Sequence, residues 1–140
     1  MDYKAGFTFG ECFDFVKGAL DMDRAPVVLC NLEHIIVYMN PTAAERYKAQ
    51  GGEKLVGKSL LMCHPPKARE IINKVLDWFR ESTDHNMIYE FRNDEENKDV
   101  YMIALRREDG TLIGYYEKHE YRDREQGNLY DFGDKYRLNL

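Results

Sequence analysis

The sequence lacks any apolar run long enough to cross a membrane. Its densest apolar stretches, residues 26–30 and 35–39, are far shorter than the about 20 residues that a membrane helix needs. Residues 1–6 also lack the beginning of an apolar core of about 7 to 15 residues, which is typical of a secretory signal. We therefore expect a soluble chain that has no membrane partner and works in the cytoplasm.

Cysteine and basic residues are also in short supply. The three cysteines, Cys12, Cys30 and Cys63, are odd in number and widely spaced, with no Cys-x-x-Cys pair. This pattern excludes a disulfide framework and does not predict a zinc site. The 20 Lys and Arg residues are outnumbered by 25 Asp and Glu residues, which leaves a net charge of −5, and no basic block exceeds Arg106-Arg107. A surface that neutralises nucleic-acid phosphates is therefore not expected.

The sequence lacks the short motifs that accompany common catalytic sites. It has no Gly-x-Ser-x-Gly, no phosphate-binding glycine loop, no Gly-x-Gly-x-x-Gly and no His-Glu-x-x-His. These motifs place a nucleophile, a phosphate, a dinucleotide or a metal through their spacing. We therefore do not expect an enzyme.

Three helices are predicted within a composition that is typical of one globular domain, with 44% hydrophobic and 32% charged residues. Apolar side chains recur at helical spacing over residues 9–20 and, as a broader stripe, over residues 67–80. A short helix is expected after Asn40-Pro41, because Asn40 can cap the first turn and Pro41 can occupy it.

Five short segments have the pattern of β-strands. The first two flank a short turn and are rich in β-branched residues, and the last two flank the hairpin signal Asp109-Gly110. Strands at both ends of a domain with helices between them predict the α+β class, here a five-stranded antiparallel sheet with helices packed on one face. The segments are residues 27–30, 35–39, 87–92, 100–106 and 111–121.

The order of these elements divides the chain into three parts. We expect an N-terminal helical extension over residues 1–24, one domain over residues 25–121 and a loosely ordered C-terminal tail over residues 122–140. The connection between the second and third strands is long enough to lay helices across the sheet. A pocket between the sheet and these helices is the natural place for a ligand.

Three stretches of the domain follow a known order of motifs. Residues 25–44 run from a hairpin into a helix of small residues after Asn40, and residues 57–60, Gly-Lys-Ser-Leu, lie before the long helix. Residues 105–114 turn on Asp-Gly and end in a further glycine. In this order they resemble the opening hairpin, the approach to the later helices and the last hairpin of the PAS family of sensory domains. The resemblance covers residues 25–121 and implies a sensory or regulatory role without naming a ligand.

A more particular resemblance lies at Cys63-His64-Pro65-Pro66-Lys67. This stretch is similar to one in a bacterial branch of the PAS family whose members are often joined to hemerythrin-like domains. The Asn-Cys-Arg stretch that flavin-binding photosensor PAS domains use is absent. The resemblance therefore argues against flavin as a cofactor.

His64 is the leading candidate for a ligand-binding side chain. It precedes two prolines that restrict its backbone and lies before the helix that walls the pocket in PAS domains. Its imidazole is able to bind a heme iron as an axial ligand or to hydrogen-bond a small molecule. The alternative is a structural role, in which the imidazole binds a loop carbonyl. Cys63 has the same two interpretations, a heme thiolate or a small buried side chain.

Periodicity assigns further side chains to the pocket. They come from the long helix and from the strands, where a register shifted by one residue would exchange the two faces of the sheet. Strand aromatics are also common in a core or on a sheet surface. The predicted ligand-binding residues are Tyr38, Cys63, His64, Ile72, Val75, Tyr89, Tyr101 and Ile103.

Two functions are compatible with these features. In the first, the domain senses a small molecule or heme and signals by associating with another protein, which requires a cavity near His64. In the second, the core is filled and the domain is a ligand-free interaction module. The helix over residues 9–20 and the outer face of the sheet would then form a homodimer or bind a signalling protein.

Overall fold

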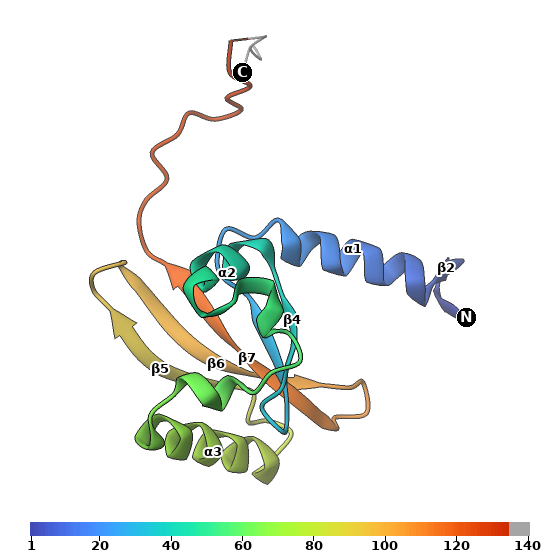
Figure 1. The fold of residues 1–140 in the computed structure, drawn as a ribbon. Coiled ribbons are helices and arrows are strands. Elements are labelled where there is room, and N and C mark those ends of the chain that lie inside the picture. Colours follow the sequence, from blue (N-terminus) through green and yellow to red (C-terminus); the bar gives the residue numbers. More distant parts are fainter. Residues whose placement is uncertain (135–140) are drawn as a thin grey trace.

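A five-stranded antiparallel sheet forms the centre of the fold (Figure 1). The computed structural model describes residues 1–134, apart from the side chain of Cys63. The strand order is β4-β3-β7-β6-β5, so the first hairpin pairs with the last strand of a meander. This arrangement confirms the predicted α+β class. The strands are β3 (Val28–Asn31), β4 (Ile36–Met39), β5 (Met87–Asn93), β6 (Lys98–Arg106) and β7 (Leu112–Tyr121).

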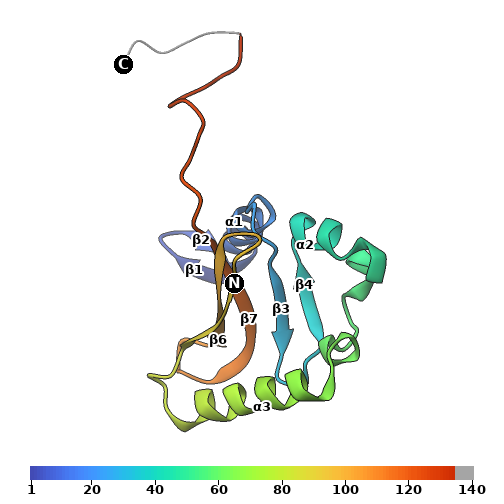
Figure 2. The ribbon, with the colours of Figure 1, turned by 90° about the vertical axis from the view of Figure 1, so that its left-hand side faces the viewer.

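Two helices and three short 3-10 turns connect β4 to β5. The helices are α2 (Pro41–Arg46) and α3 (Pro66–Glu81), which confirm the two helices predicted for this part of the chain. In Figure 2, α2 lies next to β4, and α3 runs below the strands. The turns between the helices are η1 (Lys48–Gln50), η2 (Gly52–Leu55) and η3 (Leu60–Cys63).

Helix α3 packs an apolar stripe against the inner face of the sheet. Its buried residues Ile72, Leu76 and Phe79 share one core cluster with Met102 and Tyr115 of the sheet. Spacings of three and four residues place these helical side chains on one face. Each large apolar side chain contributes about 1.5–3 kcal/mol to stability when it is fully buried. This packing is therefore a main source of the domain's stability.

Asn40 links three separate segments of the chain. Its Oδ1 accepts hydrogen bonds from the backbone N–H groups of Ala43 and Val27, both at 2.9 Å. Its Nδ2 donates to the carbonyl oxygens of Leu20 at 3.0 Å and Ala25 at 2.9 Å. The predicted N-cap of α2 is thus confirmed, and the same side chain also holds the start of β3 and the end of the N-terminal helix.

Strand β3 approaches β7 closely at Gly114, which pairs with Asn31. A Cβ atom at Gly114 would lie 2.1 Å from the carbonyl oxygen of Cys30. Only glycine fits at such a close approach of two backbones. The glycine thereby allows the neighbouring residues Cys30 and Tyr115 to pair across the two strands.

The two faces of the meander carry different side chains from those predicted. In β6, Val100 and Met102 are fully buried on the inner face. Tyr101 and Ile103 alternate with them and therefore lie on the outer face. Tyr89, which pairs with Tyr101, is 55% exposed. The prediction that Tyr89, Tyr101 and Ile103 face a pocket is therefore wrong. Residues 100–103 of β6 are apolar on both faces, so the composition there does not mark the buried face.

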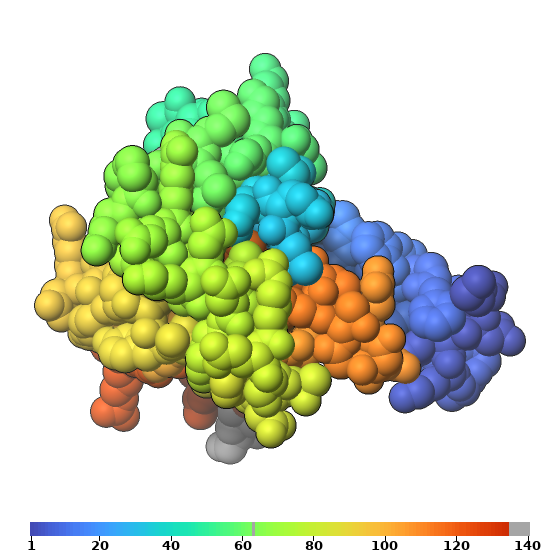
Figure 3. Space-filling view, turned by 90° about the horizontal axis from the view of Figure 1, so that it is seen from below, coloured from blue at the N-terminus to red at the C-terminus, as the bar shows by residue number. Residues whose placement is uncertain are grey.

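The N-terminal segment projects from the domain (Figure 3). Helix α1 (Phe9–Asp21) confirms the predicted helix, and a capping box between Thr8 and Glu11 begins it. A small hairpin of β1 (Asp2–Lys4) and β2 (Phe7–Thr8) precedes it and was not predicted, since such short strands carry no periodicity.

The chain beyond β7 leaves the domain without regular secondary structure as far as residue 134. The rest of the predicted tail, residues 135–140, lies outside the described residues. None of the helices in the described part of the chain is long and apolar enough to span a membrane.

Candidate functional site

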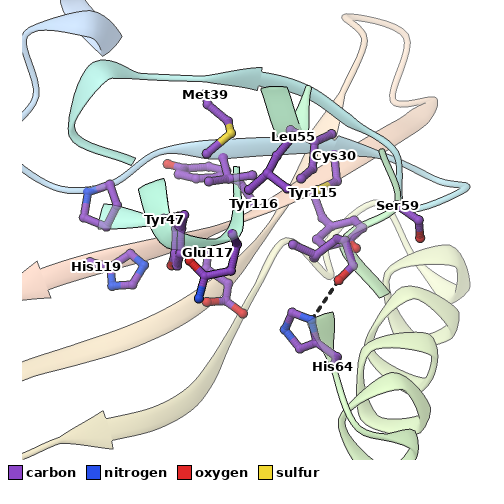
Figure 4. Close-up of a pocket in the computed structure, with 15 residues that line it drawn as sticks. Cys30, Met39, Tyr47, Leu55, Ser59, His64, Tyr115, Tyr116, Glu117 and His119 are labelled. Atoms are coloured by element: carbon purple, nitrogen blue, oxygen red, sulfur yellow. Dashed lines mark hydrogen bonds between the residues drawn. The ribbon is translucent and has the colours of Figure 1, made fainter. Parts of the chain in front are cut away.

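A cavity of about 300 Å³ lies between the inner face of the sheet and the segment from α2 to η3 (Figure 4). Its volume is at the lower end of the range of about 300 to 1,000 Å³ that is typical of ligand sites. Apolar side chains from the first hairpin and the 3-10 turns make up one part of the wall, and polar side chains the other. The lining residues are Pro26, Val28, Cys30, Ile36, Met39, Tyr47, Gln50, Leu55, Ser59, Leu60, His64, Tyr115, Tyr116, Glu117 and His119.

The segment opposite the sheet is built from turns that require glycine. Gly52 is buried with a φ of +57°, and a Cβ atom there would lie 3.2 Å from the Ala44 carbonyl oxygen. Glycine adopts this left-handed conformation without steric cost. The chain therefore curves over the cavity in short turns, of which Leu55 and Leu60 reach the wall.

His64 lies at one side of the cavity, as Figure 4 shows. Its Nδ1 donates a hydrogen bond to the Leu60 carbonyl oxygen at 2.9 Å. The Nε of Arg69 in turn donates to the His64 carbonyl oxygen at 2.9 Å, which ties the turn to α3. The bond from Nδ1 to Leu60 corresponds to the structural role that the sequence analysis left as an alternative. In this neutral tautomer the imidazole Nε2 is a hydrogen-bond acceptor.

Two carboxyl groups interact beside the cavity, and one of them lines it. Glu117 on β7 lines the wall, and Glu90 on β5 is in hydrogen-bonding contact with it. Glu90 follows Ile88 by two residues, and Ile88 packs against the core, so strand alternation places Glu90 on the inner face. Burial raises the pKa of Glu90 to about 8, and the negative charge of Glu117 adds to this shift. At neutral pH Glu90 is therefore protonated and donates to Glu117.

His119 lies beside these carboxyl groups on the same strand as Glu117. Its Nδ1 is buried and has no hydrogen-bond partner among the described residues. Burial lowers the pKa of His119 to about 4, and the positive charges of Lys98 and Arg46 act in the same direction. The imidazole is therefore neutral at physiological pH and offers an unused polar atom next to the cavity.

A network of hydrogen bonds fixes the position of Tyr115 in the cavity wall. The Tyr115 hydroxyl donates to His34 Nδ1 at 2.8 Å, and His34 Nε2 donates to Asn73 Oδ1 of α3 at 3.0 Å. His34 is 8% exposed and has a φ of +65°. His34 is therefore buried, although it lies in the turn between β3 and β4. Beside this network, burial raises the pKa of the Cys30 thiol to about 12, so Cys30 is not a reactive thiolate.

Only part of the predicted site lies at the cavity. His64 lines it, whereas Ile72 and Val75 are buried in the core cluster that α3 forms with the sheet. Tyr38 lies on the outer face, where its hydroxyl donates to Asp21 at the end of α1, so its predicted place in the pocket is wrong. The side chain of Cys63 lies outside the described part of the structure, and its role as a ligand stays a prediction.

Sequence reasoning missed Glu90, Glu117 and His119. Glu117 and His119 follow Tyr115 at intervals of two residues, which places all three on one face of β7. Polar residues on the same face as a buried aromatic were the available signal. Glu90 had a similar signal, because it alternates with Ile88, which packs against the core.

The fold resembles that of several solved structures. The C-terminal domain of a Streptococcus mutans protein has 21% identity and a TM-score of 0.62, with coverage of 86% of this chain and 90% of that one. The PAS domain of a Colwellia psychrerythraea protein has 14% identity and a TM-score of 0.57, with coverage of 79% and 97%. The PAS domain of BvgS from Bordetella pertussis has 17% identity and a TM-score of 0.54, with coverage of 81% of this chain and 88% of that one. This chain has the PAS fold.

The sequence comparisons add no closer relative. No protein-family model matches the sequence, and no curated protein matches it. The similarity of residues 63–67 to the branch that is joined to hemerythrin-like domains therefore stays a prediction. The PAS fold itself supports many unrelated ligands, so the function has to be argued from the cavity.

Proposed function

We propose that this chain is a cytoplasmic sensory domain that binds a small organic molecule in the cavity and signals through association with another protein. The observation that carries the proposal is the combination of an open cavity with buried polar atoms that lack partners, above all His119 Nδ1 beside Glu117. An apolar pocket with a few convergent polar groups is the usual form of a small-molecule site.

Strand β7 provides a route from the cavity to the protein surface. Its residues Tyr115, Glu117 and His119 line the cavity, and Lys118 and Glu120 alternate with them on the outer face. A ligand that binds one arrangement of β7 more tightly shifts the population toward it. A partner that contacts the outer face then detects the shift as a change in its binding surface.

Heme does not fit this cavity as well as a smaller molecule does. His64 has the free Nε2 and the Nδ1 hydrogen bond to a carbonyl that are typical of an axial ligand. However, the cavity has the volume of a small ligand site, and its charged lining group is a carboxylate rather than a partner for the heme propionates. We therefore do not propose heme as the ligand of this cavity.

Retention of a small molecule is the direct test. We expect native mass spectrometry of the full chain, purified from cells, to detect a bound molecule that is released on denaturation. Replacement of Leu55 by Trp fills the cavity and should abolish retention. Val56→Trp is the matched control, because Val56 is 45% exposed and does not line the cavity. Equal retention in both variants would contradict a ligand site in this cavity.

A second candidate is a protein-interaction module, which α1 favours. Across its described residues α1 has no buried side chain, and Phe13 and Phe15 are 62% and 76% exposed. Exposed apolar surface of this kind marks interaction sites. If α1 forms a homodimer, the double variant Phe13→Asp and Phe15→Asp should be monomeric by light scattering. A matched change at Asp14, to Asn, should leave the assembly unchanged.

A further inference from the structure

Glu117 at the cavity wall and Glu90, which interacts with it, have no cationic partner among the described residues. No ion pair joins Glu90 or Glu117 to a Lys or Arg within residues 1–134. The cations that act on the neighbouring His119 are paired with Glu96, since Arg46 Nη1 lies 2.7 Å from Glu96 and Lys98 Nζ lies 3.2 Å from the same residue. The buried Oε2 atom of Glu90 also lacks a hydrogen-bond partner.

Such a pair is costly to maintain in a folded protein. A buried carboxylate without a cation loses its hydration and gains no ion pair in return. Glu90 and Glu117 reduce this cost by sharing one proton, which leaves a single negative charge next to the cavity. A positively charged group in the cavity would supply both the missing charge and the missing hydrogen-bond donors.

The remaining lining restricts what that group can be. Metal ions are disfavoured, because within the described residues no group of three His, Cys, Asp or Glu side chains could hold one. The opposite wall is apolar, with Val28, Ile36 and Met39. It matches a hydrocarbon or aromatic body rather than a hydrated ion. His119 is uncharged at neutral pH and so does not repel a cation.

We propose that the cavity binds a small organic ammonium compound, with its positive head at Glu117 and Glu90 and its apolar body against the first hairpin. This inference rests on the proposed function and names the chemical class of its ligand. The ammonium N–H groups donate to the two carboxylates, and the proton that the pair shares leaves to solvent when the cation enters. Charge-assisted hydrogen bonds of this type are about twice as strong as neutral ones.

Three probes of similar size and different charge separate the effect of charge from that of shape: 2-phenylethylamine, 2-phenylethanol and phenylacetate. Isothermal titration calorimetry with the full chain should show that the amine binds about tenfold or more tightly than the alcohol, because it adds a charge-assisted contact. Phenylacetate should not bind, since its carboxylate would meet the negative charge of the pair.

The carboxyl variants test the assignment to this wall. In Glu117→Gln and in Glu90→Gln the amine should lose its advantage over the alcohol. Both variants should remain folded, because each removes a buried acid and keeps its shape. The control Glu108→Gln makes the same charge change at an exposed position and should retain the selectivity of the unmodified chain.

Several results would overturn the ammonium assignment. They are absence of amine binding at millimolar concentration, equal binding of amine and alcohol, preserved selectivity in both carboxyl variants, or equal stabilisation by Mg²⁺ or Zn²⁺. None of these depends on the retained-molecule experiment. A chain that retains a neutral or anionic molecule in the cavity would keep its proposed sensory function and lose only this ligand class.

Discussion

The inner face of the sheet is covered in two different ways. Where α3 covers it, Leu76 and Phe79 are almost completely buried in a continuous apolar cluster. Where the 3-10 turns cover it, a cavity remains, and Glu117 and His119 line it. A 16-residue helix presents a regular stripe of large side chains, whereas 3-10 turns of three or four residues present few. The part of the domain under α3, the packed part, therefore provides stability. The part under the 3-10 turns, the open part, carries the titratable side chains Glu117 and His119.

Replacing Phe79 by Ala should have the largest effect on stability. Phe79 is 0% exposed, so its removal leaves a cavity in the packed part, and we expect a loss of about 3–5 kcal/mol in the free energy of unfolding. Leu55→Ala removes a side chain that already borders open space and should cost about 1 kcal/mol. Urea unfolding of both variants measures the contrast. Similar losses would show that the two parts are equally well packed.

Asn40→Ala should have the second-largest effect on stability. We expect a loss of about 2–4 kcal/mol in the free energy of unfolding, because the change leaves buried backbone N–H groups without their acceptor. The side chain is fully buried and connects α1, β3 and α2. Asn40→Asp keeps the acceptor for Val27 and Ala43 but loses the donor to Leu20. Hydrogen exchange should therefore show that the aspartate variant releases α1 more than α2. Uniform loss of protection in both helices would contradict separate roles for the two ends of the amide.

The order and class of the elements could be predicted because each has a local signal. The stripe of α3 repeats at helical spacing, Asn40-Pro41 begins α2, and Asp109-Gly110 turns the last hairpin. These signals depend on neighbouring residues and on the chemistry of turns. The five-stranded sheet follows from their order.

The site could be predicted only at His64, because its other groups depend on tertiary contacts. Residues 100–103 of β6 are apolar on both faces, so alternation alone does not distinguish Met102 inside from Tyr101 outside. The contact of Glu90 with Glu117 spans β6, which lies between their two strands, and the burial of His34 depends on α3, which provides Asn73. These contacts form between distant segments and leave no periodicity in the sequence.

The pH dependence of stability should distinguish the open part from the packed part. Because the pKa of Glu90 is raised to about 8, the folded state retains a proton that the unfolded state releases, and stability should fall as pH rises from about 5 to 8. Because the pKa of His119 is lowered to about 4, stability should also fall as pH drops from about 6.5 to 4. Each effect is about 1–3 kcal/mol after allowance for partial solvent exposure.

Thermal unfolding across this pH range provides the measurement. Glu90→Gln should remove the loss between pH 6.5 and 8, and His119→Gln should reduce the loss on the acid side. Phe79→Ala should lower the whole curve without changing its shape, since it removes no titratable group. If Glu90→Gln left the alkaline slope intact, the carboxyl pair would not be its source.

Tyr89→Phe should have the smallest effect on stability, and it tests whether Tyr89 lies on the outer face of the sheet. The Tyr89 hydroxyl donates to Asp99 Oδ1 at 2.8 Å in an exposed position, so its removal should change the free energy of unfolding by less than about 0.5 kcal/mol. Tyr115→Phe removes a buried hydroxyl that donates to His34 and should cost about 1–2 kcal/mol. Tyr89→Phe should leave retention of a small molecule unchanged, because its ring lies on the outer face. A loss of retention in Tyr89→Phe would place that ring at the ligand, and the inner and outer faces of β5 would have to be exchanged.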